Sequence, residues 1–179
     1  LSISVSGDVS ALKIIGKAYT AASLSIDVQN HDTFDLYLQL EDLQFRTTKI
    51  SSSGSRRIYI TGENSKLSRI DAPKATVCFV DTVNMNVTGI TGTDGDSSSP
   101  SGGSGTDAVT ANELFLDFTG ELNIYGGNGG TGHIGAIDKV SGNGLPSGNG
   151  GSGANGINAQ TVYILGQSKL NCYGGNGGN

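Results

Sequence analysis

The sequence predicts an all-β protein: a single parallel β-solenoid (β-helix) with glycine-rich, polyglycine-II-like insertions packed alongside it. Three observations in the 179 residues lead to this fold class. Short strand patterns recur along the chain, similar residues return at matching places within them, and glycine recurs every third residue between them. Apolar residues alternate with a period of two, which is the period of strands and not of helices.

The N-terminal fifth of the chain carries the weakest version of the strand pattern. Residues 1–35 alternate through Leu12, Ile14, Leu24 and Ile26, which indicates one or two N-terminal coils or a cap. From residue 36 onward the pattern sharpens into apolar-X-apolar triplets that start at residues 36, 58, 77, 114 and 162, so 22, 19, 37 and 48 residues separate them. Spacings near 20 residues fit one solenoid turn, and the longer ones fit a turn with an insertion.

Each triplet is followed by a second short apolar pattern, which we expect to be the next strand of the same coil. These patterns are Leu43-Gln44-Phe45, Leu67 with Ile70, Met85-Asn86-Val87, Leu122-Asn123-Ile124 and Leu170-Asn171-Cys172. The last two units align without a gap at a spacing of 48 residues, and both end in Tyr-Gly-Gly-Asn-Gly-Gly. We therefore assign residues 1–179 to one solenoid domain, with a cap or coils in 1–35, regular coils in 36–90, and coils with glycine-rich insertions in 91–179. The insertions are placed at 89–108 and 126–156.

Glycine is concentrated in the second half of the chain, where 24 of the 29 glycines lie after residue 90. Gly126, Gly129, Gly132 and Gly135 are three residues apart, as are several glycines between 144 and 156. An extended helix with three residues per turn places such glycines on one edge, where neighbouring helices approach closely. This favours ordered polyglycine-II-like segments. A flexible Gly/Ser linker is the alternative, strongest for 97–105.

Stacked coils would align the triplets into columns. We expect seven apolar residues of the last two units to point inward: Leu114, Leu116, Leu122, Ile124, Val162, Ile164 and Leu170. The middle residues would form an outer column of Tyr37, Tyr59, Cys78, Phe115 and Tyr163, and Asn86, Asn123 and Asn171 would form another. The aromatic column either stabilises the strands, contacts sugar rings or a partner, or is covered by the glycine segments. The candidate contact surface is Tyr37, Tyr59, Phe115, Tyr163, Tyr125 and Tyr173.

At residues ~72–179 the pattern resembles glycine-rich β-solenoid surface proteins, including bacterial and phage adhesins whose GGX-type segments form polyglycine-II bundles. The likeness rests on Tyr125–Gly130 and its copy at Tyr173–Gly178. It implies an extracellular or cell-surface structural or adhesive subunit of a fibre or appendage, and it carries over no catalytic residue. Glycans are a further expected partner.

Signals for chemistry are sparse, so we expect no enzyme, no cofactor and no metal. His31 and His133 lack companions at metal-ligand spacing, and Asp94, Asp96 and Asp107 do not form a calcium-binding repeat. A polysaccharide-degrading enzyme is the rival, with three candidate acids and three arginines: Glu113, Asp117, Glu121, Arg56, Arg57 and Arg69. A glycan- or ice-binding module is a further alternative.

The net charge of the chain and the length of its apolar runs argue against two kinds of partner, nucleic acid and the membrane interior. A formal charge of -5 argues against nucleic acid, and no apolar run approaches the ~18 residues of a membrane span. Cys78 and Cys172 lie two repeats apart, beyond disulfide reach, so both are expected to be free.

Unpaired strand edges at the two ends predict self-association. We expect a head-to-tail contact of residues 1–15 with 157–179, or further repeats of the same protein. The assembly residues would be Leu1, Ile3 and Val5 at one end, and Tyr173 and Asn176 at the other.

Overall fold

A computed structural model describes most of the chain: residues 1–5, 9–16, 22–29, 35–135, 144, 146–165 and 169–179. Within these ranges the backbone forms strands and extended segments, and no helix. The strands are β1 (Ser2–Val5), β2 (Ala11–Ile15), β3 (Ser23–Val28), β4 (Leu36–Glu41), β5 (Thr47–Ser52), β6 (Arg57–Glu63), β7 (Lys66–Leu67), β8 (Arg69–Val83), β9 (Met85–Thr88), β10 (Val109–Asp117), β11 (Glu121–Tyr125), β12 (Ile157–Leu165) and β13 (Lys169–Tyr173).

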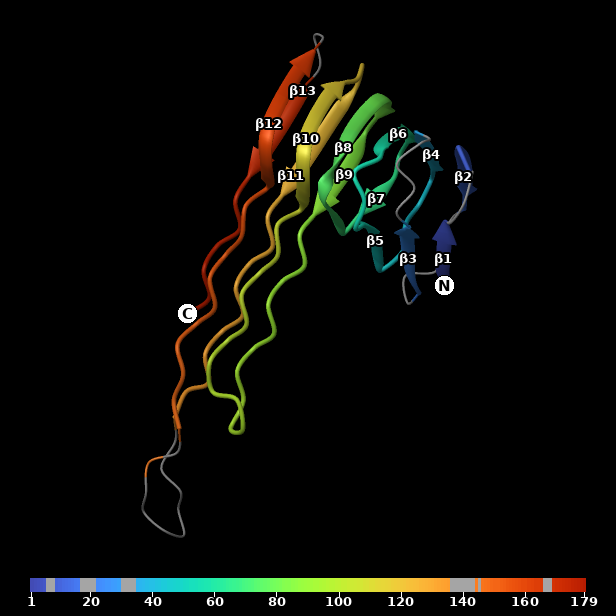
Figure 1. Cartoon of the computed structure of the whole chain (residues 1–179). Helices are drawn as coiled ribbons and strands as arrows, with labels where there is room; N and C mark the ends of the chain where they lie inside the picture. Colours follow the sequence, from blue (N-terminus) through green and yellow to red (C-terminus); the bar gives the residue numbers. More distant parts are fainter. Residues whose placement is uncertain (6–8, 17–21, 30–34, 136–143, 145, 166–168) are drawn as a thin grey trace.

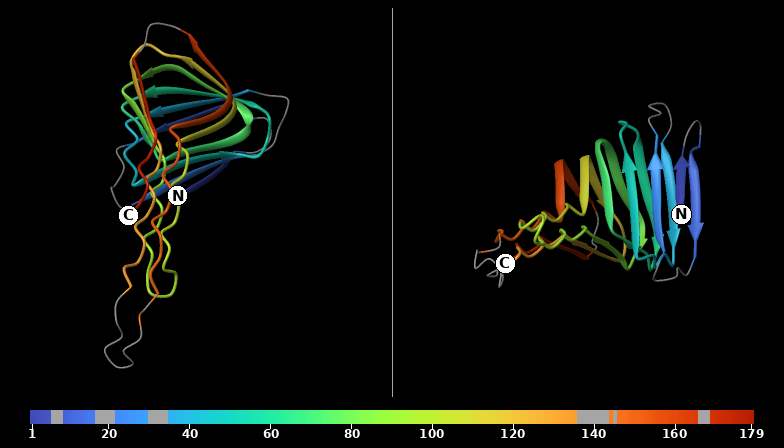
Figure 2. Two further views of the ribbon diagram at one scale, coloured as in Figure 1. Left: turned by 90° about the vertical axis from the view of Figure 1, so that its left-hand side faces the viewer. Right: turned by 90° about the horizontal axis from the view of Figure 1, so that it is seen from below.

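The strands of the described ranges form two parallel sheets (Figure 1). The larger has nine strands: β1-β3-β5 and β2-β4-β6 are two arms that both join β8, and β10 and β12 follow on its far side. The smaller has four strands in the order β13-β11-β9-β7. Seen from the β12 end, the sheets surround a common interior, and the glycine-rich segments extend away from them (Figure 2).

The expected single β-solenoid of stacked, equivalent coils is wrong as a description of this fold. Strand pairing instead gives two sheets of unequal size, and the larger is a curled, branched sheet. The physical reason is the 15-residue strand β8. Its first residues pair with β5 and its later residues with β6, so one uninterrupted strand joins two arms that the repeat pattern treats as separate strands.

Two of the expected second strands are also corrected. Leu67 belongs to β7 in the small sheet, but Ile70 belongs to β8 in the large sheet, so the two residues do not share a strand. Leu43 makes only an isolated bridge, and Gln44 and Phe45 are not in a strand. Short apolar patterns do not show where a strand ends, because a corner of the chain can lie between two apolar residues that are close in sequence.

Three corners at which the chain leaves the large sheet are built by Asp and Asn. Asp42, Asn64 and Asn84 have positive φ angles of 54°, 51° and 52°, and they lie where the chain leaves β4, β6 and β8. These side chains tolerate the left-handed conformation better than other non-glycine residues. The corners thus turn the chain without requiring glycine.

The interior holds the inward-facing apolar columns. Leu114, Leu116, Leu122 and Ile124 are fully buried, as expected. Val162 and Ile164 are not: they are 40% and 65% exposed. Both lie on β12, which pairs only with β10 in the described structure, so their side chains are covered from one side only.

The described parts of the glycine segments lie side by side and are hydrogen-bonded at every third residue, in agreement with the three-residue period of glycine. Segment 126–133 donates backbone hydrogen bonds to two neighbours, from Gly126, Gly129 and Gly132 to segment 173–179, and from Gly127, Gly130 and His133 to segment 100–106. Segment 89–95 donates to 125–131, and segment 148–154 donates to 127–133, again at every third residue.

Close approach explains why glycine is needed in this bundle. A Cβ added at Gly129 would overlap the carbonyl oxygen of Gly151, and one added at Gly130 would overlap that of Thr93. Neither position requires a positive φ, so it is the backbone contact and not the backbone conformation that demands glycine. The period of three places these contacts on fixed edges of each segment.

Candidate functional site

The candidate site is the outer face of one arm of the large sheet, where the expected aromatic column lies. Strand register aligns its members across neighbouring strands: Tyr37 on β4, Tyr59 on β6, Cys78 on β8, Phe115 on β10 and Tyr163 on β12. The register of the column therefore follows the prediction, while its use as a contact surface stays a prediction.

Stacking covers one face of each ring in two pairs of this column. Tyr37 and Tyr59 lie 4.5 Å apart between ring centroids with an interplanar angle of 4°, and Phe115 and Tyr163 lie 4.3 Å apart at 17°. Because paired rings cover each other's faces, a ligand could stack only where the column is interrupted or ends. The two stacked pairs therefore leave ring faces free at the ends of the column and beside Cys78.

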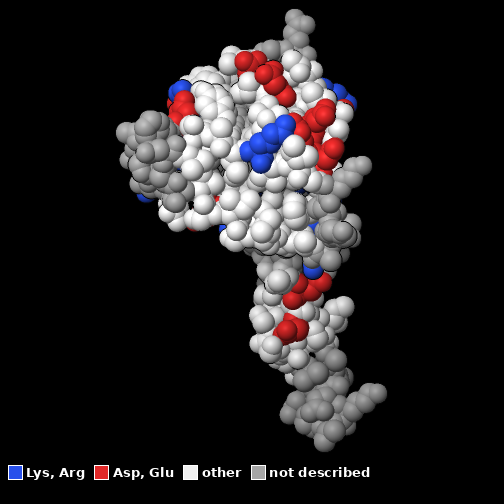
Figure 3. All heavy atoms as spheres, turned by 90° about the vertical axis from the view of Figure 1, so that its right-hand side faces the viewer, with Lys and Arg blue, Asp and Glu red and all other residues white. Residues whose placement is uncertain are grey.

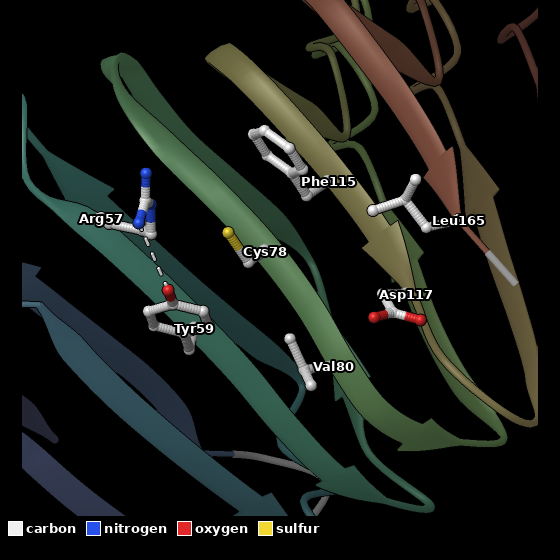
Figure 4. Close-up of a pocket in the computed structure, with 7 residues that line it drawn as sticks. All are labelled: Arg57, Tyr59, Cys78, Val80, Phe115, Asp117 and Leu165. Atoms are coloured by element: carbon white, nitrogen blue, oxygen red, sulfur yellow. Dashed lines mark hydrogen bonds between the residues drawn. The ribbon is translucent and has the colours of Figure 1, made fainter.

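Cys78 interrupts the column between the two stacked pairs. The side chains around it line a hollow of about 240 Å³: Arg57, Tyr59, Cys78, Val80, Phe115, Asp117 and Leu165. Figure 4 shows Cys78 between Tyr59 and Phe115, with Arg57 toward one end of the hollow and Asp117 toward the other. A second hollow of about 230 Å³ shares Tyr59 and Val80 and reaches Tyr37. The small cysteine side chain thus opens the only described break within the column.

The two ends of the hollow differ in charge. The Arg57 guanidinium lies 3.5 Å from the Tyr59 hydroxyl oxygen, and this contact raises the pKa of Arg57, so it remains a cation. Asp117 is exposed and provides a carboxylate. The floor between them is uncharged at neutral pH, because burial raises the pKa of the Cys78 thiol to about 11. The hollow therefore has apolar walls, with a hydrogen-bond donor, Arg57, at one end and an acceptor, Asp117, at the other.

The candidate acids are not gathered into a catalytic pair. Glu113 and Asp117 are four residues apart on β10, which is ~13 Å along a strand and wider than the ~5–10 Å of glycosidase carboxylates. Glu121 lies in the small sheet and pairs with Lys169 at 3.0 Å. The hydrogen bond and ion pair with Lys169 lower the pKa of Glu121, which keeps it ionised.

The candidate arginines are likewise separated. Only Arg57 reaches the hollow. Arg56 is buried and donates to the Val9 carbonyl oxygen, and burial lowers its pKa. Arg69 pairs with Asp71 at 3.0 Å. Of the three candidate arginines, only Arg57 therefore shares a site with a candidate acid, because it lines the same hollow as Asp117.

The aspartates weighed as calcium ligands serve the glycine bundle instead. Asp94 accepts hydrogen bonds from the Thr131 amide and hydroxyl, and Asp107 accepts from the Asn155 amide. Asp96 accepts from Ser98 and Ser99. In the described part of the chain, no three His, Cys, Asp or Glu side chains converge as metal ligands would.

The remaining predicted residues are dispersed. His133 bonds through its amide to the Pro100 carbonyl, and His31 lies outside the described residues. Tyr125 and Tyr173 stack at 5.4 Å, at the base of the glycine segments. Both cysteines are free. Of the expected assembly residues, Leu1 is 75% exposed, whereas the Val5 side chain is buried.

Two members of the predicted asparagine column are hydrogen-bonded to each other. The Asn171 side-chain amide donates to the Asn123 side-chain oxygen at 2.7 Å, in the predicted register.

Figure 3, which views the β1–β2 end, shows Lys and Arg interspersed with Asp and Glu. The described atoms of this face therefore present mixed charge and not a continuous basic surface.

Sequence reasoning missed the contribution of Val80, Leu165 and Asp81, which line the two hollows. The sequence did contain one sign of the hollow: Cys78 is a small residue within an otherwise aromatic column, so it leaves a gap of one ring.

Among the described residues there is no helix of the length and apolarity that crossing a bilayer requires. Comparison with family models, with curated proteins and with solved structures gives no match for this chain.

Proposed function

We propose that the protein is an adhesive structural subunit of an extracellular fibre or surface appendage, and that it binds glycans through its outer aromatic face. The glycan-binding part of the proposal rests on the hollow over Cys78. Its walls are aromatic and apolar, and its ends carry a guanidinium and a carboxylate. Sites for small polar ring molecules combine apolar lining with a few placed polar groups in this way.

Binding is favoured over cleavage because the acids lie apart. The common mechanism of glycoside hydrolases places two carboxyl groups across one scissile bond, whereas Glu113 and Asp117 are separated along a single strand by the length of four residues. The formal charge of -5 also disfavours a polyanionic nucleic-acid partner. A glycan with uncharged hydroxyl groups is the ligand class that fits both facts.

Affinity electrophoresis in gels containing soluble polysaccharides tests this function. The wild-type protein should be retarded by at least one glycan, and Phe115→Ala should reduce the retardation. Tyr125→Ala is the matched control, because Tyr125 belongs to a stacked pair outside the hollow. Equal migration of the wild-type protein in all gels would contradict the proposal, and so would equal loss in the control variant.

Assembly is the structural part of the proposal, and the exposed strand β12 supports it. The inward columns that are fully buried at Leu114 and Leu116 continue to Val162 and Ile164, where they are exposed. Exposed apolar side chains beside unpaired strand edges favour pairing with another strand. A second copy that presents β1 and β2 would form a contact between unlike surfaces, which propagates as a filament.

Sedimentation velocity over a range of protein concentrations tests assembly. We expect species larger than the monomer for the wild-type protein and a monomer for Ile164→Lys, since a charge on the β12 edge opposes pairing. Ile134→Lys is the control, because Ile134 is exposed on a glycine segment far from β12 in the chain. A wild-type protein that stays monomeric at high concentration would overturn the assembly proposal.

A further inference from the structure

We propose that the gap over Cys78 is a subsite for one pyranose ring whose substituents are all equatorial, as in gluco-configured β-glycans. The ring would insert between Tyr59 and Phe115 with its two faces against the two side chains. This inference rests on the proposed glycan binding and adds to it the class of sugar and the residues that select it.

The width of the gap matches a single ring. Neighbouring parallel strands are ~4.8 Å apart, and β8 separates β6 from β10, so Tyr59 and Phe115 are two spacings, or ~9.6 Å, apart. A ring midway between them would lie ~4.8 Å from each. The protein's own stacked pairs have nearly this spacing, at 4.5 and 4.3 Å. The inserted ring would therefore occupy the missing place in the column.

The chemistry of the walls and ends favours an all-equatorial sugar. Such a ring presents C–H groups on both faces, and these carry the slight positive charge that the negative face of an aromatic ring attracts. Its hydroxyl groups project in the ring plane, along the strands, toward Arg57 at one end and Asp117 at the other. Each hydroxyl can both donate and accept, so both charged groups gain a partner.

An axial hydroxyl would be disfavoured in the same gap. It would point at the face of Tyr59 or Phe115, where no described polar side chain lines the wall. A hydroxyl that loses water without gaining a hydrogen bond weakens binding. A galacto-configured ring, which has one axial hydroxyl, should therefore bind more weakly than a gluco-configured ring.

Cys78 makes the gap available because its side chain is short and uncharged. The high pKa of its thiol keeps it neutral, so the floor of the gap resembles the apolar walls. Phenylalanine at this position would place a ring in the gap, as Phe115 does one strand away. Alanine would leave the gap open. The two substitutions thus separate occupation of the gap from loss of the thiol.

The test compares Cys78→Phe with Cys78→Ala in gels that contain a soluble β-glucan or a soluble β-galactan. The wild-type protein and Cys78→Ala should bind the glucan with similar affinity, at least about tenfold more tightly than the galactan, which corresponds to ~1.4 kcal/mol. Cys78→Phe should lose glucan binding by at least about tenfold. Phe115→Leu, which removes one wall, provides a second variant if Cys78→Phe does not fold.

The outcomes separate the subsite from the general function. Glucan binding that survives both Cys78→Phe and Phe115→Leu overturns the subsite but leaves glycan binding intact. Preference for the galactan overturns the assigned configuration. Absence of binding to every glycan overturns the proposed function and the subsite together.

Discussion

Leu116 and Ile164 are partners in register on neighbouring parallel strands, yet Leu116 has no exposed surface and Ile164 is 65% exposed. The two residues continue one inward column. Leu116 is enclosed because β8 and β12 flank β10 on both sides, whereas β12 has one described neighbour. The same sequence pattern therefore has different energetic consequences at the two positions.

The effect of a charge in this column should differ accordingly. We expect Leu116→Asp to destabilise the fold by roughly 3–5 kcal/mol, because it buries a carboxylate without a partner. Ile164→Asp should cost less than about 1 kcal/mol, since the side chain already contacts water. Chemical denaturation of the two variants measures this difference. Similar destabilisation by both would show that the assigned interior is wrong.

The glycine bundle predicts a second difference between matched positions. Gly130→Ala should destabilise the bundle by roughly 1–3 kcal/mol, because its Cβ would overlap the Thr93 carbonyl oxygen and the neighbouring segments are held by backbone contacts. Gly177→Ala is the control, since the nearest atom to its Cβ would be 3.7 Å away. Hydrogen exchange of the glycine amides reports the loss. Unchanged protection in Gly130→Ala would contradict the close packing described above.

Acid should weaken the bundle through Asp94. The hydroxyl and amide of Thr131 hold the pKa of Asp94 below its ordinary value of 3.8. A carboxyl whose pKa is lower in the folded state contributes stability above its unfolded pKa and loses it as pH falls through the folded value. We therefore expect Asp94→Asn to be less stable than wild type near pH 6, and the difference to shrink below about pH 4. Thermal unfolding at both pH values measures it, and a pH-independent difference would refute the role of Asp94.

The sequence was sufficient to predict local periods. Alternation placed Leu114 and Leu116 inward, the triplets aligned Tyr59 with Cys78 and Phe115, and the glycine period predicted ordered neighbouring segments. Each of these follows from a repeat that is visible within a few residues. Strand identity at corners could not be predicted in this way, because Ile70 fits the same alternation whether it ends one strand or begins the next.

The position of Cys78 in the column indicates a gap, but the column alone does not show which ring faces line it. Its opening depends on which ring faces are covered, and that depends on the stacking of Tyr37 on Tyr59 and of Phe115 on Tyr163. The exposure of Ile164 was likewise missed, since an alternating pattern gives the direction of a side chain but not the presence of a neighbouring strand. Both features arise from tertiary neighbours.

The two cysteines should differ in reactivity toward an alkylating reagent. Cys78 is buried and its thiol has a pKa of about 11, so little thiolate is present at pH 8. Cys172 is exposed, although partial burial also raises its pKa. We expect Cys172 to be labelled first, as measured by mass spectrometry of the digested protein. Faster labelling of Cys78 would contradict the assigned burial.

The rate of Cys78 alkylation in the presence of a soluble β-glucan tests glycan binding at the hollow most directly. A ring inserted between Tyr59 and Phe115 would cover the thiol, so we expect labelling of Cys78 to slow as the glucan concentration rises while labelling of Cys172 stays constant. An unchanged rate at Cys78 under conditions that saturate binding, or an equal slowing of both cysteines, would contradict it.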